Sequence, residues 1–195
     1  MSDATGKKGG LMSDPTFIAG LSGLAFLVGW LLFGRKKETP IVGPASFFAR
    51  LWTATYDVGL ATVPRIILIA QAAHESGWGS ARTSKLARNY WNVTAGTTWK
   101  GPVLSSTDLE YANSSAPKKI VQRFRVYTSD REAVLDIIRF LRTPRYSNAY
   151  ARLIAGDTEG YLSELRKAGY FTAPLETYTR AINGIIPSLV KLVTS

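Results

Sequence analysis

The chain has 195 residues, of which 46% are hydrophobic and 19% are charged. This length allows one core of ordinary size with an appended segment, and the composition excludes a disordered tail. The chain has no cysteine and only one histidine, His74. Disulfide frameworks, thiol nucleophiles and zinc sites built from Cys or several His are therefore excluded, and we expect neither a metal nor a cofactor. A formal net charge of +10 favours an anionic partner, which could be nucleic acid, anionic lipid or a bacterial wall polymer.

Residues 15–34 carry no charged side chain. As a helix this run would be about 30 Å long, close to the hydrocarbon thickness of a bilayer. It is apolar on every face, and no small-x-small cleavage site follows Phe33, which disfavours a buried globular helix and a cleaved signal peptide. The sequence predicts a polar tail over 1–14, a single transmembrane helix over 15–34 and a basic, proline-containing linker over 35–44.

The remaining residues, 45–195, predict one soluble domain that begins with helices. Apolar positions at helical spacing favour a helix over 45–58, a very apolar helix from Pro64, and a short helical stretch over 81–87. Two strand candidates, 103–111 and 118–127, flank the polar turn ANSSAP and predict a β-hairpin.

Helices resume after the hairpin. Ser129 and Glu132 match a capping box, another helix is expected after Tyr146, Asp157 can cap a third, and Pro174 can begin the last. The order predicts an α+β fold, mainly helical, with a small β-hairpin lobe inserted between helical parts and a cleft between them.

Glu75 is the most informative carboxylate because it ends the very apolar helix and precedes Ser-Gly-Trp-Gly. Burial and the negative end of the helix dipole would raise its pKa and keep it protonated near neutrality, as a general acid requires. The alternative is a glutamate that ends a helix and points to water. The neighbouring His74 is expected to be a packed or capping residue, because adjacent helical side chains point about 100° apart.

Glu110 lies on the first hairpin strand, across the predicted cleft from Glu75. Two carboxyl groups on opposite walls can divide glycoside hydrolysis, one protonating the leaving oxygen and the other activating water. The alternative is an exposed strand glutamate that balances Lys118 or Lys119.

Aromatic residues are frequent in the middle and end of the domain, and sugar rings stack on aromatic faces. Trp78 and Tyr170 adjoin glycines in loop-like sequence and are the better candidates for exposure. Most of the others are expected in the core.

The sequence resembles the family 73 glycoside hydrolases, the β-N-acetylglucosaminidases of bacterial peptidoglycan. The resemblance runs from about Pro64 to Ile186, through IAQAAHESGWGSA, NYWNVTAG, WKG, TDLEY, FRVY, PRY and AGYFTAP. It implies a lysozyme-like fold, Glu75 as general acid, Glu110 as second carboxylate on a mobile β lobe, and Tyr170 beside the cleaved sugar. It matches Asp136 to a helix aspartate with a structural role.

Within the resemblance, one segment departs from the family pattern. Where the family usually has NLFGIK, this chain has Asn-Tyr-Trp-Asn-Val-Thr over 89–94, which alters details of the sugar subsites. Substrate-binding residues are expected to be Trp78, Trp91, Asn92, Tyr111 and Tyr146.

The sequence therefore predicts a peptidoglycan hydrolase that cleaves the glycan strand after N-acetylglucosamine. A muramidase or lytic transglycosylase on the same polymer, and a non-catalytic, membrane-anchored structural or wall-binding protein, are the alternatives. Nucleic-acid binding is not expected, because the basic residues are dispersed without a recognition motif.

The predicted anchor adds a lipid bilayer as a partner and a single-pass membrane location. Two cations precede the span and three follow it, a bias that places the domain in the cytoplasm, away from the wall. The hypothesis that reconciles these points is a phage lytic protein, in a virion membrane or a host inner membrane, with virion or membrane proteins as further candidate partners. A cell-encoded enzyme facing the periplasm is the alternative.

Overall fold

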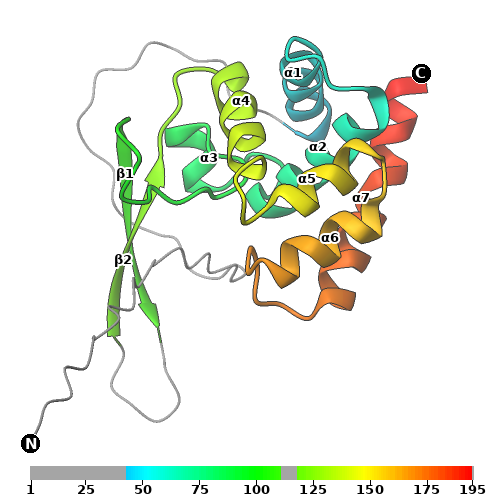
Figure 1. The fold of residues 1–195 in the computed structure, drawn as a ribbon. Coiled ribbons are helices and arrows are strands. Elements are labelled where there is room, and N and C mark those ends of the chain that lie inside the picture. Colours follow the sequence, from blue (N-terminus) through cyan, green and yellow to red (C-terminus); the bar gives the residue numbers. More distant parts are fainter. Residues whose placement is uncertain (1–42, 111–117, 195) are drawn as a thin grey trace, which may run out of the picture.

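The computed structural model describes residues 43–110 and 118–194, with the backbone alone described for 107–110 and 118–120. The helices are α1 (Pro44–Tyr56), α2 (Thr62–Ser76), α3 (Arg82–Ala87), α4 (Asp130–Leu141), α5 (Ser147–Ile154), α6 (Thr158–Lys167) and α7 (Leu175–Thr194). The strands are β1 (Val103–Glu110) and β2 (Lys118–Arg125), which pair antiparallel. The predicted order of helices, hairpin and helices is confirmed, and the hairpin stands out from one side of the helical body (Figure 1).

The predicted membrane span over 15–34 lies outside the described residues. Of the helices in the described part of the chain, none combines the length and the apolar character needed to cross a bilayer.

Helix α2 is the centre of the core. Ten consecutive residues, 64–73, are buried, which explains why the segment is apolar on every face rather than amphipathic. It packs against α1, α5 and α7. The helix ends at Gly77, whose left-handed backbone (φ 54°) costs a glycine little. The enclosed stretch thus ends at Ala73, and Glu75 lies just beyond it in the last turn of the helix.

The caps read from the sequence are present, with one difference. The Ser129 hydroxyl accepts from the Glu132 N–H at 3.1 Å, and the Asp157 carboxylate accepts from the Gly160 N–H at 2.9 Å. The Glu132 carboxylate accepts from the N–H and the hydroxyl of Thr128, at 2.7 and 2.6 Å. In a capping box the Glu132 side chain would accept from the N–H of Ser129. Here it bonds to Thr128 instead, because the hydroxyl and the N–H of Thr128 together offer two donors.

The hairpin is held at its base by the loop that follows α3. In the ladder, Val103 is opposite Arg125 at the base and Glu110 is opposite Lys118 at the far end. Thr94 bridges to Phe124, and the Ala95 N–H donates to the Arg123 carbonyl at 2.7 Å. Strand β2 is two residues shorter than predicted, and the N–H of Tyr127, beyond its end, donates to the Ala87 carbonyl.

Helix α1 is fastened to the start of α4 by a cluster of charges. Arg50 donates to both oxygens of Asp130, at 2.7 and 2.8 Å, and Tyr90 and Arg88 donate to Asp130 at 2.6 and 3.2 Å. Burial alone would raise the pKa of Asp130, but the hydrogen bonds from Arg50 and Tyr90 and the nearby arginine charges together lower it. The ionised carboxylate is therefore the form that the fold stabilises.

We predict that Asp130→Asn lowers the free energy of unfolding at neutral pH by about 2 kcal/mol, the scale of lost hydrogen bonds to a charged group. The folded pKa lies below the unfolded one, so this stability is present above the unfolded pKa, about 4, and is lost as pH falls through the folded pKa. Urea unfolding at pH 7, 5 and 3 measures it. An equal gap between the two proteins at all three values would contradict the charge-based account.

Candidate active site

The site is built around the carboxyl group of Glu75, in the last turn of α2. The side chain is half-buried, whereas residues 64–73 of the same helix are enclosed in the core. One carboxyl oxygen, Oε1, accepts a hydrogen bond from the Tyr178 hydroxyl at 2.6 Å. The other, Oε2, lies 3.4 Å from the donating amide nitrogen of Asn92. Residues from α2, α7 and the loop after α3 therefore meet at this carboxyl group.

The surroundings of Glu75 favour its neutral form. Burial raises the pKa of the Glu75 carboxyl, and although Tyr178, His74 and Asn92 lower it in part, the net shift is upward. The direction agrees with the prediction from sequence. Both neighbours donate their hydrogen bonds to the carboxyl group, so neither competes as an acceptor for its acidic proton.

A chain of buried hydrogen bonds stands behind Tyr178. Tyr161 on α6 donates to the Gln71 side-chain oxygen at 2.6 Å, and the Gln71 amide donates to the Tyr178 hydroxyl at a long 3.5 Å. Gln71 and Tyr161 have no solvent exposure. Because Gln71 presents its N–H to Tyr178, the tyrosine is left to donate its own proton toward Glu75. Burial and the Glu75 charge raise the pKa of Tyr178 well above its usual value, which keeps it a neutral donor.

Tyr178 is fixed by its ring as well as its hydroxyl. Phe171 stacks on it with the ring centroids 3.9 Å apart, and His74 meets it edge-on at 4.9 Å. His74 thus packs on an aromatic ring, as expected of a packed rather than a basic histidine.

Sequence reasoning missed Tyr178, Gln71 and Tyr161. Gln71 lies four residues before Glu75, a spacing that places both on one face of α2 and could have drawn attention to it. Tyr178 is more than a hundred residues away in sequence, and no local pattern distinguishes it from the other tyrosines.

Three residues expected at the substrate lie in the core instead. Tyr170 is 1% exposed and its hydroxyl donates to the Trp91 carbonyl at 2.6 Å. Trp91 is 1% exposed and its indole N–H donates to the Leu68 carbonyl at 3.1 Å, while Tyr146 is 2% exposed and packs on Phe140. In this structure these large rings fill the interior of a small domain. Their contact with sugar stays a prediction.

Trp78 and Asn92 remain near the site with part of their surface open. Trp78 follows Glu75 in the turn that ends α2, is half-buried, and packs edge-on against Phe47. Asn92 is half-buried and has a left-handed backbone, φ 52°. Their roles toward substrate stay predictions.

Glu110 occupies the far end of β1, seven register positions beyond the Val103–Arg125 pair at the base of the hairpin. At about 3.3 Å per residue, this is about 23 Å from that base. Its side chain, and all of Tyr111, lie outside the described residues, so the second carboxylate and the Tyr111 contact stay predictions.

Asp136 is a structural residue, in agreement with the expectation. Its carboxylate accepts from Arg125 at 2.8 Å and from the Tyr127 hydroxyl at 2.7 Å. These bonds join α4 to the end of β2.

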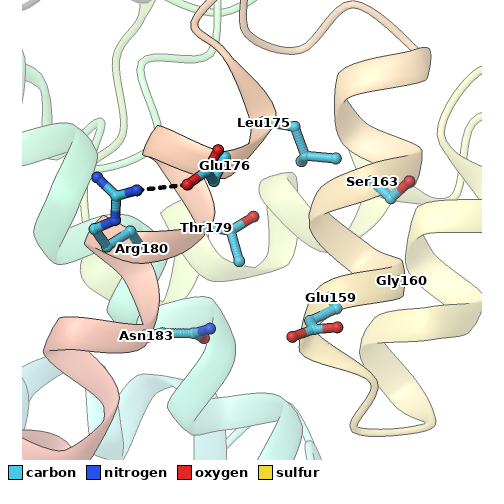
Figure 2. Close-up of a pocket in the computed structure, with 8 residues that line it drawn as sticks. All are labelled: Glu159, Gly160, Ser163, Leu175, Glu176, Thr179, Arg180 and Asn183. Atoms are coloured by element: carbon cyan, nitrogen blue, oxygen red, sulfur yellow. Dashed lines mark hydrogen bonds and ion pairs between the residues drawn. The ribbon is translucent and has the colours of Figure 1, made fainter.

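Two grooves over the described residues lie away from Glu75. One, of about 750 Å³, runs between α6 and α7 and is lined by Glu159, Gly160, Ser163, Leu175, Glu176, Thr179, Arg180 and Asn183 (Figure 2). The other, about 470 Å³, lies between α5 and α6. Glu75 lines neither groove, so the cleft expected beside it stays a prediction. Within residues 43–110 and 118–194, no three His, Cys, Asp or Glu side chains are grouped to hold a metal ion.

The domain is mainly helical with a small two-stranded sheet, and a half-buried glutamate of raised pKa lies at the end of its central helix. Together these features are typical of lysozyme-like glycosidases. Residues 59–191 match the glucosaminidase family, described as mannosyl-glycoprotein endo-beta-N-acetylglucosaminidase. The chain belongs to this family and carries its glycoside hydrolase domain.

Individual relatives agree with that assignment. The peptidoglycan hydrolase FlgJ of Salmonella typhimurium is 39% identical over 161 residues, which cover 79% of this chain and 49% of that protein. FlgJ of Escherichia coli K12 is 39% identical over 132 residues, which cover 65% of this chain and 40% of that protein. The chain thus spans about half or less of the length of these curated relatives.

Solved structures confirm the fold. The C-terminally truncated glycoside hydrolase domain of Salmonella typhimurium FlgJ superposes with a TM-score of 0.56 at 32% identity, covering 76% of this chain and 99% of that one. A peptidoglycan hydrolase mutant from Sphingomonas sp. A1 gives 0.57 at 29% identity, covering 77% and 98%. The lysozyme-like, mainly helical fold with a two-stranded sheet is therefore shown.

We predict that Tyr170→Phe lowers the free energy of unfolding by about 1 to 3 kcal/mol, because the buried Trp91 carbonyl loses its hydroxyl donor. Chemical denaturation measures this cost. A variant as stable as wild type would contradict the structural role of the Tyr170 hydroxyl.

Proposed function

We propose that this chain hydrolyses the glycan strand of peptidoglycan at the bond that follows N-acetylglucosamine, with Glu75 as general acid. The observation that carries the proposal is the Glu75 carboxyl group, half-buried, raised in pKa and held by two donors at the end of a rigid core helix. Family membership and the relatives named peptidoglycan hydrolases support the substrate class.

In the proposed reaction, the C1–O bond of the sugar breaks as the Glu75 proton passes to the leaving oxygen. Positive charge develops at C1 and the ring oxygen, and the Glu75 carboxylate left behind is stabilised by the Tyr178 hydroxyl and the Asn92 amide. A water then attacks C1 and gives up a proton to complete hydrolysis. The preorganised donors lower the cost of forming a partly desolvated carboxylate.

We propose two candidate acceptors for the proton of the attacking water. Glu110 would serve as the general base if the hairpin bends over Glu75, because in an extended hairpin Glu110 lies at the end remote from the helical body. The alternative is assistance by the acetamido group of the substrate. In that alternative, Tyr178 has the role beside the cleaved sugar that the resemblance implied for Tyr170. The Tyr178 hydroxyl donates to the Glu75 carboxyl group, whereas the Tyr170 hydroxyl donates to the Trp91 carbonyl.

The charge of the domain suits the proposed polymer. Residues 41–195 hold 19 of the 24 basic and 11 of the 14 acidic residues. Peptidoglycan carries carboxylates on its peptides, and a net positive surface would raise its local concentration.

We predict that Glu75→Gln reduces wall hydrolysis by about 10²- to 10⁴-fold, the usual contribution of a general acid, with the fold retained. Glu176→Gln is a matched control, because Glu176 is exposed and pairs with Arg180 one turn away on α7. Dye release from labelled peptidoglycan gives the rates. Full activity of Glu75→Gln would end the assignment.

The bond cleaved distinguishes the proposed activity from its nearest alternative. Mass spectrometry of digested wall should show reducing N-acetylglucosamine ends. Reducing or anhydro N-acetylmuramic acid ends would instead identify a muramidase or lytic transglycosylase. Binding to wall material with no lysis in a zymogram would identify the non-catalytic alternative.

The N-terminal segment is part of the same proposal. Residues 15–34 would anchor the domain in a bilayer as a single-pass helix, supported by a charge-free run of membrane-spanning length. A phage lytic protein in a virion or host inner membrane is the biological setting that we propose. Detection of the chain in purified particles would support the virion version, and its absence from them would contradict it.

We predict that the full chain floats with lipid vesicles in a density gradient and that Leu24→Arg with Leu27→Arg abolishes flotation. A charge in the middle of a span costs about 2.5 to 3.5 kcal/mol on insertion scales. Equal flotation of both proteins would rule out anchoring through residues 15–34.

A further inference from the structure

At the end of α2, the backbone carbonyl of Glu75 has a different kind of hydrogen-bond donor from its neighbours. The carbonyls of Ala73, His74 and Ser76 accept from N–H groups of the turn that follows the helix, at 2.9, 3.5 and 2.9 Å. The carbonyl of Glu75 instead accepts from the Asn92 side-chain amide at 3.0 Å. A side chain distant in sequence therefore completes the C-terminal cap of the helix at the residue that bears the acid.

The same amide nitrogen also reaches the Glu75 carboxyl oxygen Oε2, at 3.4 Å. Asn92 thus contacts both the backbone and the side chain of one residue, while Tyr178 holds the opposite carboxyl oxygen. Two contacts to one residue restrict rotation about the bonds between its backbone and its carboxyl group.

The amide of Asn92 is oriented by Thr83. The Thr83 hydroxyl donates to the Asn92 side-chain oxygen at 2.9 Å, so the donating NH₂ end must face Glu75. With the amide reversed, an oxygen would face the Glu75 carbonyl and the Thr83 donor would lose its acceptor.

The backbone around Asn92 is fixed from both sides. Asn89 is bonded to the N–H and the carbonyl of Val93 at 2.9 and 2.8 Å, and Tyr170 donates to the Trp91 carbonyl at 2.6 Å. The left-handed conformation at φ 52° is one that asparagine tolerates better than most residues and that glycine adopts freely.

We propose that Asn92, oriented by Thr83, is a positioning residue that holds the general acid Glu75 through its carbonyl and carboxyl groups, rather than a residue that binds sugar. The proposal rests on the proposed function for the catalytic role of Glu75. The contacts themselves do not depend on that role.

The groups that face Glu75 set the direction of the expected effects. They are His74 on α2, Tyr161 from α6, Tyr170 from the loop before α7, and Tyr178 from α7. The three tyrosines are neutral and His74 already lowers the pKa of Glu75 in wild type, so loss of the Asn92 donor removes stabilisation of the carboxylate that no other group replaces. The pKa of Glu75 should then rise further.

The test compares Asn92→Gly and Asn92→Asp with wild type in the full chain. Glycine fits the left-handed backbone and removes only the side chain, whereas aspartate keeps the shape, donates nothing and adds a negative charge. The pKa of Glu75, followed by ¹³C NMR of its carboxyl carbon and assigned with Glu75→Gln, should rise in Asn92→Gly and rise more in Asn92→Asp. An unchanged titration in both variants would overturn the proposal.

Thr83 offers a matched pair. Thr83→Val removes the hydroxyl that orients the amide and should raise the pKa of Glu75, whereas Thr83→Ser keeps the hydroxyl and should titrate like wild type. Equal titration of the valine and serine variants would contradict the role of Thr83.

Kinetics separate positioning from sugar binding. With wall fragments as substrate, Asn92→Gly should lower kcat by about tenfold to a hundredfold and leave KM unchanged, the pattern of a misplaced catalytic group. A raised KM with unchanged kcat would identify Asn92 as a substrate-binding residue and overturn the proposal. If wild type itself fails to hydrolyse wall, the proposed function fails, and the carboxyl titration still decides the role of Asn92.

Discussion

The enclosure of α2 is the constraint on which the rest of the molecule depends. Ten consecutive residues of this helix are buried, so most of its surface must be covered by other elements, and α1, α5 and α7 cover it. Beyond this stretch, at its C-terminal end, the helix reaches the surface again. A carboxyl group placed at that end is half-desolvated by the core and still open on one side, and a general acid needs both conditions.

Burial alone would not fix the orientation of the Glu75 side chain. Tyr178 and Asn92 fix it from opposite sides, and each is in turn oriented by a further residue, Gln71 for the tyrosine and Thr83 for the asparagine. These partners come from α2, α3, α7 and the loop after α3, so the site forms only when the helical body has assembled. Large rings in the core, such as Tyr170 and Trp91, support this arrangement from the interior.

The helices, the hairpin and the position of Glu75 at the end of its helix were predictable from sequence because each rests on local signals. The capping residues Ser129 and Asp157, the turn between the strands and the apolar run before Glu75 act over a few residues. Tyr178 was not predictable in this way, since its contact with Glu75 joins residues 103 apart. The burial of Tyr170, Trp91 and Tyr146 was not predictable, because an aromatic residue beside a turn has the same local pattern whether its ring faces sugar or the core.

The proposed role of Glu75 requires the fold to keep its carboxyl group protonated up to a higher pH than an ordinary glutamate. Its direct test is the titration of the Glu75 carboxyl carbon by ¹³C NMR in the wild-type chain without substrate. We expect the midpoint of this titration to lie above the usual glutamate pKa of about 4.3. A midpoint at or below that value would show that Tyr178 and Asn92 outweigh burial, and would contradict the assignment of Glu75 as an acid prepared by the fold.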